Sequence, residues 1–209
     1  LGLKQPRQYS LSDIPASDHF RISVKKENPK AEGQDPGYVS STLHQHIQEK
    51  DVIELSAPTG NFTLAPQSGK PTVLVSGGIG LTPMITMLKQ SLMNNANSKT
   101  PVHFIYAARN SSVHPLKDEL KALTNKYDNL HVHINYNEVN SHDVQGLDYH
   151  MAGHLNLKAL DKQWLPHNAE YYLCGPIPFM QQQNQALLDL GITAHQIHSE
   201  AFGTGGTAL

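Results

Sequence analysis

The stretch VLVSGGIGLTPM, from Val73 to Met84, decides how the chain folds. It joins a short apolar run, typical of a buried strand, to three glycines and then to a helical spacing of apolar residues. In parallel sheets, ligands bind at the carboxyl ends of strands, where such junctions lie. Bare glycine backbone lets phosphate oxygens reach N–H groups, and the helix N-terminus adds partial positive charge. A purely structural turn explains the same signal equally well, so the stretch alone does not decide between a phosphate site and a structural turn.

The dinucleotide fingerprint G-x-G-x-x-G is not complete in this stretch, because Gly78-Ile79-Gly80-Leu81-Thr82 is followed by Pro83. Thr82 is a favourable N-cap residue, and proline at the first helical position loses no hydrogen bond. We therefore predict that Pro83 begins a helix that Thr82 caps.

Strands and helices alternate regularly after residue 70. The expected strands are 71–76, 102–108, 130–136, 170–174 and 197–201, and the expected helices are 81–93, 115–127 and 179–190. This alternation predicts a parallel sheet with helices on both faces. The first third instead has strand-like alternation at 8–12, 20–26 and 52–57, with Ser40 and Ser41 expected to cap a short helix. The fold class is therefore α/β plus β, with a β-domain at 1–66 and a nucleotide-binding α/β domain at 67–209.

Composition excludes several classes of protein. The chain has 209 residues, of which 38% are hydrophobic and 16% charged, and this suits one large or two small globular domains. A net charge of −2 gives no basic field for nucleic acid or an anionic membrane. No apolar run approaches the roughly 20 residues that span a bilayer. The single cysteine, Cys174, excludes an internal disulfide and fits a reducing compartment, so we expect a cytoplasmic protein.

Two further positions on the α/β half carry possible chemistry. Arg109 follows the second expected strand, where it could meet the 2′-phosphate of NADP or simply be a solvated surface arginine. LCGPIPFM, from Leu173 to Met180, is a second strand-to-helix junction expected on the same sheet edge. A lone cysteine is most often inert packing, and no base or positive charge beside Cys174 activates it. A thiol that lines a nicotinamide pocket is a better functional interpretation than a nucleophile.

The β half offers two candidate segments. Arg7-Gln8-Tyr9-Ser10 presents a guanidinium for phosphate, an aromatic ring for stacking and a small hydroxyl donor. Gly37-Tyr38-Val39-Ser40-Ser41 is a second loop of backbone donors that leads into a helix. Taken singly, each is better explained as an ordinary structural segment, the first as an exposed strand and the second as a capped helix.

The 13 histidines invite a metal interpretation, which the pattern does not support. His44 and His46 are two residues apart, as are His131 and His133, but no cysteine or carboxylate cluster completes a tetrahedral set. No metal site is therefore predicted, and no Ser-His-Asp arrangement or catalytic carboxylate pair can be identified.

Five motifs follow one another along the chain, and their order is more specific than any one of them: RQYS, GYVSS, GGIGLTPM, CGPIPFM and the C-terminal SEAFG. With them, the chain resembles the ferredoxin-NADP-reductase-like superfamily, and more closely the reductase portion of bacterial flavohaemoglobins, the nitric oxide dioxygenases. The resemblance covers essentially the whole chain. It implies an NAD(P)H-dependent oxidoreductase that passes hydride to N5 of FAD and single electrons on to haem, in a globin domain of the same full-length chain.

The resemblance also implies roles for individual residues. Arg7 contacts the FAD pyrophosphate, Tyr9 packs on the isoalloxazine and Ser10 lies near N5, while Thr82 points towards the nicotinamide. The residues expected nearest the hydride path, our catalytic set, are Ser10, Thr82, Cys174 and Glu200. The cofactor-binding set, to which we add Arg109, is Arg7, Gln8, Tyr9, Ser10, Gly37, Val39, Ser40, Ser41, Gly77, Gly78, Ile79, Gly80, Leu81, Thr82, Pro83, Arg109, Cys174, Gly175, Pro176, Phe202 and Gly203.

The chain departs from the family's pattern in three places. Ala201 stands where close members often have cysteine, and the tail 204–207 is glycine-rich. The sequence also begins almost at RQYS, which in the family lies partway through a six-stranded flavin barrel. We therefore expect a partial antiparallel FAD-binding β-barrel, with the earlier strands and any haem-binding globin domain outside the sequence. Alternatives are a reductase for an iron–sulfur or free-flavin acceptor, or a nucleotide-binding module without redox activity, and the choice between NADH and NADPH stays open.

Overall fold

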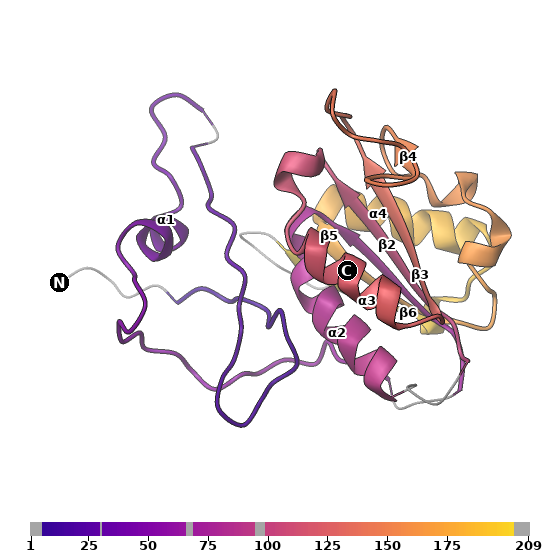
Figure 1. Ribbon diagram of the computed structural model, residues 1–209, viewed down its shortest axis with the longest axis horizontal. Helices are drawn as coiled ribbons and strands as arrows, with labels where there is room; N and C mark the ends of the chain where they lie inside the picture. Colours follow the sequence, from indigo (N-terminus) through magenta and orange to yellow (C-terminus); the bar gives the residue numbers. More distant parts are fainter. Residues whose placement is uncertain (1–5, 30, 66–68, 95–98, 203–209) are drawn as a thin grey trace.

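A six-stranded parallel sheet forms the core of the α/β part, at the right of Figure 1, in the computed structural model, which describes residues 6–29, 31–65, 69–94 and 99–202. Its strands are β1 (Thr72–Gly77), β2 (Val102–Ala108), β3 (Leu130–Tyr136), β4 (Met151–Ala152), β5 (Glu170–Pro176) and β6 (Ile197–Phe202). They lie in the order β4-β3-β2-β1-β5-β6, and every neighbouring pair is parallel. The predicted parallel-sheet half is confirmed.

Helices cover both faces of this sheet, as the strands' continuous apolar sequences require. Because side chains alternate along a strand, Leu74 of β1 packs with α2 (Leu81–Asn94), and Val73 and Val75 pack on the other side with α4 (Ile177–Asp189). The helix α3 (Lys117–Lys126) shares the first face with α2. The short turns η3 (Leu157–Ala159) and η4 (Lys162–Trp164) share the second face with α4, which Figure 1 shows in yellow behind the sheet.

The strand order reverses between β1 and β5. Strands β2 and β3 continue from one side of β1, whereas β5 and β6 continue from the other. Gly77 pairs in register with Ala107, and Ser76 pairs with Cys174, so the loops after β1, β2 and β5 begin at the same edge. This is the position at which open α/β sheets bind ligands.

Helix starts differ from the sequence prediction. Thr82 is not an N-cap, since the 3-10 turn η1 (Gly78–Gly80) runs directly into α2 and Thr82 already lies inside that helix. Helix α3 begins at Lys117 and not at Pro115, because Leu116 takes a left-handed backbone conformation with φ of 57° and so separates the proline from the helix. The bounds of β2 and β3 agree with the sequence prediction.

The N-terminal part differs more. Between residues 6 and 65, the described chain contains the helix α1 (Tyr38–Gln45) and one antiparallel bridge, Leu11–Ile22, but no longer strand. The strands predicted at 8–12, 20–26 and 52–57 are therefore not formed. The apolar side chains Val52 and Leu55 are 97% and 66% exposed, and strand pairs without an apolar face to pack on are not stable alone.

Helix α1 also corrects the prediction that Ser40 and Ser41 cap it. The helix begins at Tyr38 with Gly37 before it, so both serines lie inside its first turn. The Ser40 hydroxyl donates a hydrogen bond to the Gly37 carbonyl at 3.0 Å, which stabilises the earlier start. The division predicted between residues 66 and 67 lies outside the described residues.

Candidate functional site

The loop after β1 folds tightly against the end of β5. Gly80 has no room for a side chain, because a Cβ there would lie 2.3 Å from the backbone oxygen of Cys174. Gly78 has φ of +55°, a left-handed conformation that favours glycine, and open space surrounds the position of its missing Cβ. The two glycines thus have different physical roles: Gly80 permits close packing, and Gly78 turns bare backbone outward.

The second junction packs directly on the first. A Cβ at Gly77 would lie 3.1 Å from the ring of Phe179, and one at Gly175 would lie 2.9 Å from the same ring. Phe179 stands in the first turn of α4, so this helix rests on the backbone of both glycines. The two strand-to-helix junctions therefore pack together as one unit at the switch point of the sheet, and Gly78 is the glycine among them whose missing Cβ faces open space.

A buried tyrosine supports the loop from below. The Tyr106 hydroxyl, from β2, donates a hydrogen bond to the Gly78 carbonyl at 3.2 Å. The ring of His114 lies 4.7 Å from that of Tyr106, and its Nδ1 is 2.7 Å from the Tyr136 hydroxyl. Burial, with a smaller contribution from Lys117, lowers the pKa of His114 to about 4, so this imidazole is neutral at pH 7.

Sequence reasoning missed this support. The only available signal was that Tyr106 and Tyr136 both lie near the carboxyl ends of their strands, two register positions apart, on the face that packs with α2. Buried tyrosine hydroxyls usually find a partner, but the sequence does not say which one.

Thr82 and Pro83 lie where the chain leaves the loop. Thr82 is 3% exposed, and its hydroxyl donates a hydrogen bond to the Ile79 carbonyl at 3.1 Å. The Thr82 hydroxyl therefore links the first turn of α2 to η1 by donating a hydrogen bond. The hydroxyl of an N-cap residue would instead accept a hydrogen bond from a backbone N–H. The backbone N–H groups of this first turn face the same sheet edge as Gly78.

Cys174 and Glu200 are register partners on β5 and β6. The thiol is fully buried, and burial together with the nearby Glu200 carboxylate raises its pKa well above the usual range. Burial also raises the pKa of Glu200. Cys174 thus stays a neutral thiol, and its backbone carbonyl is the group that faces Gly80.

Arg109 is exposed at the carboxyl end of β2. Its backbone oxygen accepts a hydrogen bond from the N–H of Glu138 at 2.8 Å, which links the loops after β2 and β3. On the same loops, the Asn140 amide donates to the Ser111 hydroxyl at 2.8 Å. The loops after β2 and β3 therefore carry the Arg109 guanidinium together with two carboxylates, Glu138 and Asp143, of which Asp143 accepts a hydrogen bond from the Asn140 N–H at 3.0 Å.

The segment that contains Arg7, Tyr9 and Ser10 leads onto α2. The Thr86 hydroxyl donates a hydrogen bond to the Leu11 carbonyl at 2.9 Å, and Thr86 follows Thr82 by one helical turn on the same face. Burial raises the pKa of Tyr9, and the neighbouring charge of Arg7 opposes that rise. RQYS and the loop after β1 are thus brought to the same helix.

The two serines of the GYVSS segment differ in their hydrogen bonds. The Ser40 hydroxyl accepts a hydrogen bond from the Glu27 N–H at 3.1 Å. The Ser41 hydroxyl is buried and has no hydrogen-bond partner within the described chain. A buried, unpaired hydroxyl at a helix start is a fitting donor for an oxygen-rich ligand.

The C-terminal candidates are described in part. The backbone of Phe202 ends β6 in register with Pro176, so SEAF reaches the edge that carries the second junction. Gly203 lies outside the described residues. No cluster of three or more potential metal ligands occurs among the residues that the structure describes.

Comparisons with known proteins agree with this geometry. Residues 74–185 match the model of the family described as "Oxidoreductase NAD-binding domain". The chain belongs to this family. Within it, the chain corresponds to the reductase portion of flavohemoproteins, because it is 46% identical over all its 209 residues to the flavohemoprotein of Bordetella pertussis. It is also 45% identical over 203 residues to that of Rhizobium meliloti.

A solved structure supports the same placement. The flavohem-like FAD/NAD-binding domain of nitric oxide dioxygenase from Vibrio cholerae has a TM-score of 0.80 with this oxidoreductase domain, at 34% identity. The match covers 95% of this chain and 77% of that one. A flavohemoglobin from Malassezia yamatoensis, with bound FAD and heme, has a TM-score of 0.69 at 27% identity, over 95% of this chain and 47% of that one.

The flavohemoproteins are longer than this chain, which spans about half the length of the curated relatives it matches. In the described ranges, none of the helices of this oxidoreductase domain is long and apolar enough to cross a membrane.

Proposed function

We propose that this oxidoreductase domain transfers hydride from NAD(P)H to FAD and passes single electrons to haem, in the reductase half of a nitric oxide dioxygenase. The electron acceptor in this proposal is a globin domain of the same full-length chain, in the cytoplasm. The observation that carries it is the narrow surface where the loops after β1 and β5 pack together, with Gly80 against the Cys174 carbonyl and open space beside the backbone of Gly78. Such a surface at a sheet's switch point suits a flat, negatively charged dinucleotide.

On the nicotinamide side, this chain's own groups bind and orient. The N–H groups from Gly78 into the first turn of α2 bind the pyrophosphate, and the Tyr106 hydroxyl holds the Gly78 carbonyl so that the loop does not rearrange. Pro176, exposed at the end of β5, forms the wall beside the nicotinamide, with Cys174 buried behind it. Glu200 and Phe202 belong to the neighbouring strand β6, where their backbones are in register with Cys174 and Pro176, and in this proposal they are the residues of β6 nearest the nicotinamide.

On the flavin side, Arg7 supplies a cation for the FAD pyrophosphate and Tyr9 a ring for the isoalloxazine, with Ser10 beside N5. The buried and unpaired Ser41 hydroxyl supports a phosphate at the start of α1, together with Gly37 and Val39. In this proposal residues 1–66 belong to the FAD-binding part and residues 67–209 to the NAD(P)-binding domain, although the described chain before β1 forms one antiparallel bridge and no barrel strands.

The chemistry follows from position. Bound FAD supplies a two-electron acceptor that can release electrons singly. Hydride transfer needs stacking and near-attack geometry rather than a strong acid or base, and this agrees with a neutral Cys174 thiol. Thr82 and Ser10 therefore position the two rings, and the loops exclude water from between them.

Anaerobic stopped-flow absorbance of the full-length protein with bound FAD tests this proposal. Mixing with NADH is expected to bleach the flavin absorbance in a single turnover, and haem reduction is expected to follow at a rate that depends on prior flavin reduction. Flavin that stays oxidised at saturating NADH and NADPH contradicts the proposed hydride transfer. Haem that stays oxidised beside reduced flavin contradicts the proposed acceptor and favours an iron–sulfur or free-flavin acceptor.

A further inference from the structure

Four charged side chains join the N-terminal segment to the α/β domain, and we call Asp13, Arg21, Lys89 and Glu119 the clasp. Lys89 Nζ of α2 lies 2.7 Å from a carboxylate oxygen of Asp13 and also forms an ion pair with Glu119 of α3. Arg21 Nη1 lies 3.3 Å from Asp13 and 3.0 Å from Glu119. Each cation thus pairs with both carboxylates, and a closed square of charges results.

The clasp is sheltered from solvent. The side chains of Lys89, Glu119, Asp13 and Arg21 are 17%, 24%, 25% and 33% exposed. Salt screens partly buried pairs less than it screens exposed ones, and a network holds its geometry better than one pair. Burial pushes the pKa of Asp13 up, but hydrogen bonds from Lys89 and the Ile14 N–H, with the charges of Lys89 and Arg21, bring it below its usual value.

The clasp is connected to the candidate hydride path at both ends. On one side, Asp13 follows Ser10 by three residues, and the Leu11 carbonyl between them is held by the Thr86 hydroxyl at 2.9 Å. On the other side, Thr82, Thr86 and Lys89 have the spacing i, i+4, i+7, which places them along one face of α2. The segment after RQYS is therefore fixed to α2 at Thr86 and at Lys89.

We propose that the clasp positions Tyr9 and Ser10 relative to Thr82, and so sets the distance between the flavin and the nicotinamide. This inference rests on the proposed hydride transfer. Lys89 and Asp13 are positioning residues in it, since they act through the backbone of residues 10–13 and touch neither ring. A misplacement of the donor by about 1 Å can cost about 100-fold in rate, so a small movement of this segment is enough to be measured.

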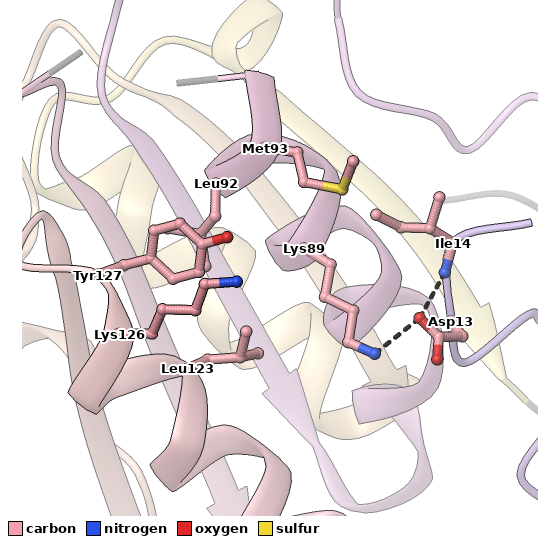
Figure 2. Close-up of a pocket in the computed structure, with 8 residues that line it drawn as sticks. All are labelled: Asp13, Ile14, Lys89, Leu92, Met93, Leu123, Lys126 and Tyr127. Carbon is pink, nitrogen blue, oxygen red and sulfur yellow. Dashed lines mark hydrogen bonds and ion pairs between the residues drawn. The ribbon is translucent and has the colours of Figure 1, made fainter. Parts of the chain in front are cut away.

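Figure 2 shows why Lys89 is a suitable position for a test. Its Nζ points to Asp13, whose Oδ1 also accepts a hydrogen bond from the Ile14 N–H at 2.8 Å. The stem of Lys89 borders a pocket of about 290 Å³ that Leu92, Met93 and other side chains line. Methionine at this position keeps the apolar contacts and removes only the charge, while Arg21 still pairs with both carboxylates.

The experiment uses the full-length protein with bound FAD and three variants: Lys89→Met, Lys89→Arg and the control Lys158→Met. Lys158 forms an ion pair with Asp189 of α4, on the opposite face of the sheet, and its side chain is 48% exposed. Anaerobic stopped-flow reduction over a range of NADH concentrations gives the limiting rate constant of flavin reduction and the dissociation constant for NADH. The long-wavelength charge-transfer absorbance reports the approach of the two rings directly.

Lys89→Met is expected to lower the limiting rate constant by about tenfold and to weaken the charge-transfer band, with the NADH dissociation constant within about twofold of wild type. Lys89→Arg is expected to restore the rate to within about threefold, because arginine reaches both carboxylates. Lys158→Met is expected to match wild type. If circular dichroism shows that Lys89→Met is unfolded, Asp13→Asn, which keeps an acceptor for the Ile14 N–H, is measured in its place with the same expectation.

An unchanged limiting rate in Lys89→Met, or in the substitute Asp13→Asn, overturns the positioning role. So does an equal loss in Lys158→Met, since that result indicates a general effect of losing an ion pair. The two proposals separate in the same experiment. Wild-type protein that does not reduce its flavin overturns the proposed function, whereas normal reduction in both wild type and Lys89→Met overturns only the clasp.

Discussion

Gly80 shows at the scale of one residue how closely the two junctions approach. The position of its missing Cβ lies 2.3 Å from the Cys174 carbonyl oxygen, which belongs to the backbone of a central strand and cannot move aside. At Gly77 the corresponding contact is 3.1 Å, and it is made to the ring of Phe179. The same added methyl group thus meets rigid backbone at one position and a side chain at the other.

We expect Gly80→Ala to lower the free energy of unfolding by about 1–3 kcal/mol, because overpacking against backbone forces strands apart. Gly77→Ala is expected to cost less than about 1 kcal/mol, since the Phe179 ring can tilt. Urea unfolding of both variants beside wild type measures the difference. Equal losses at the two positions contradict the close approach of the loop to β5.

Arg109 is a second position where one side chain carries a specific expectation. If its guanidinium meets a 2′-phosphate, Arg109→Glu should raise the dissociation constant for NADPH about tenfold more than that for NADH. Lys121→Glu, an exposed change of the same charge on α3, is the control and should affect both cofactors equally. Titration calorimetry with each cofactor makes the comparison. Equal effects on NADH and NADPH in Arg109→Glu show that Arg109 does not contact the 2′-phosphate.

At the scale of elements, β2 supports the loop that follows β1. The Tyr106 hydroxyl reaches the Gly78 carbonyl at the carboxyl end of the sheet. The Tyr171 hydroxyl of β5 donates instead to the Pro166 carbonyl at 2.9 Å, just before its own strand begins. Two buried tyrosines of one sheet thus make similar bonds at opposite ends.

Tyr106→Phe and Tyr171→Phe are each expected to lower the free energy of unfolding by about 1 kcal/mol, the usual net value of one hydrogen bond. Only Tyr106→Phe is expected to weaken NADH binding, by about threefold, because it releases the phosphate loop. Chemical unfolding and calorimetric titration of both variants test this. Weaker NADH binding in Tyr171→Phe as well would show that the effect is not local to the loop.

The N-terminal elements show the limit of local pattern. Residues 20–26 and 52–57 alternate as strands do, yet a strand also needs a partner and a buried face. The described chain supplies neither for Val52 and Leu55. Helix α1 needs only its own backbone bonds, and it forms near the predicted place.

At the scale of the whole molecule, buried histidines make stability depend on pH. Burial is the main reason that the pKa values of His103, His114 and His133 fall from 6.5 to about 4, with smaller contributions from neighbouring positive groups. Their neutral forms are the ones that fit the fold. Between those two pH values the unfolded chain binds more protons than the folded one, so stability rises with pH in that window.

We expect the free energy of unfolding to fall steadily as pH drops from about 6.5 to about 4. The clasp loses stability at the lower end of this range and beyond it, because the pKa values of Asp13 and Glu119 are lowered and their contribution is lost as pH drops below the usual values of 3.8 and 4.5. Urea unfolding at a series of pH values measures this dependence. His103→Leu is expected to flatten it in part, whereas His154→Leu, at an exposed position, should leave it unchanged. Equal stability at pH 7 and about pH 5 contradicts the expectation.

The sequence alone determined the parts of this protein that depend on neighbours along the chain. Apolar runs, glycines and helical spacing are local signals, and they located five strands of the parallel sheet, the α-helices and both strand-to-helix junctions, whereas the two-residue strand β4 was not predicted. Thr82 was assigned to the helix start, although its capping role was wrong because η1 continues into α2. The order of the motifs then indicated the family that the comparisons showed.

Only the tertiary structure decided what depends on residues far apart in the sequence. The contact of Gly80 with Cys174, the bond from Tyr106 to Gly78, and the clasp between Asp13 and Lys89 each join segments that local patterns treat separately. Strand order and register set which of these groups meet, and they follow from packing the whole sheet rather than from any single stretch. A local pattern specifies an element, whereas the position of one element against another is fixed by the shared core.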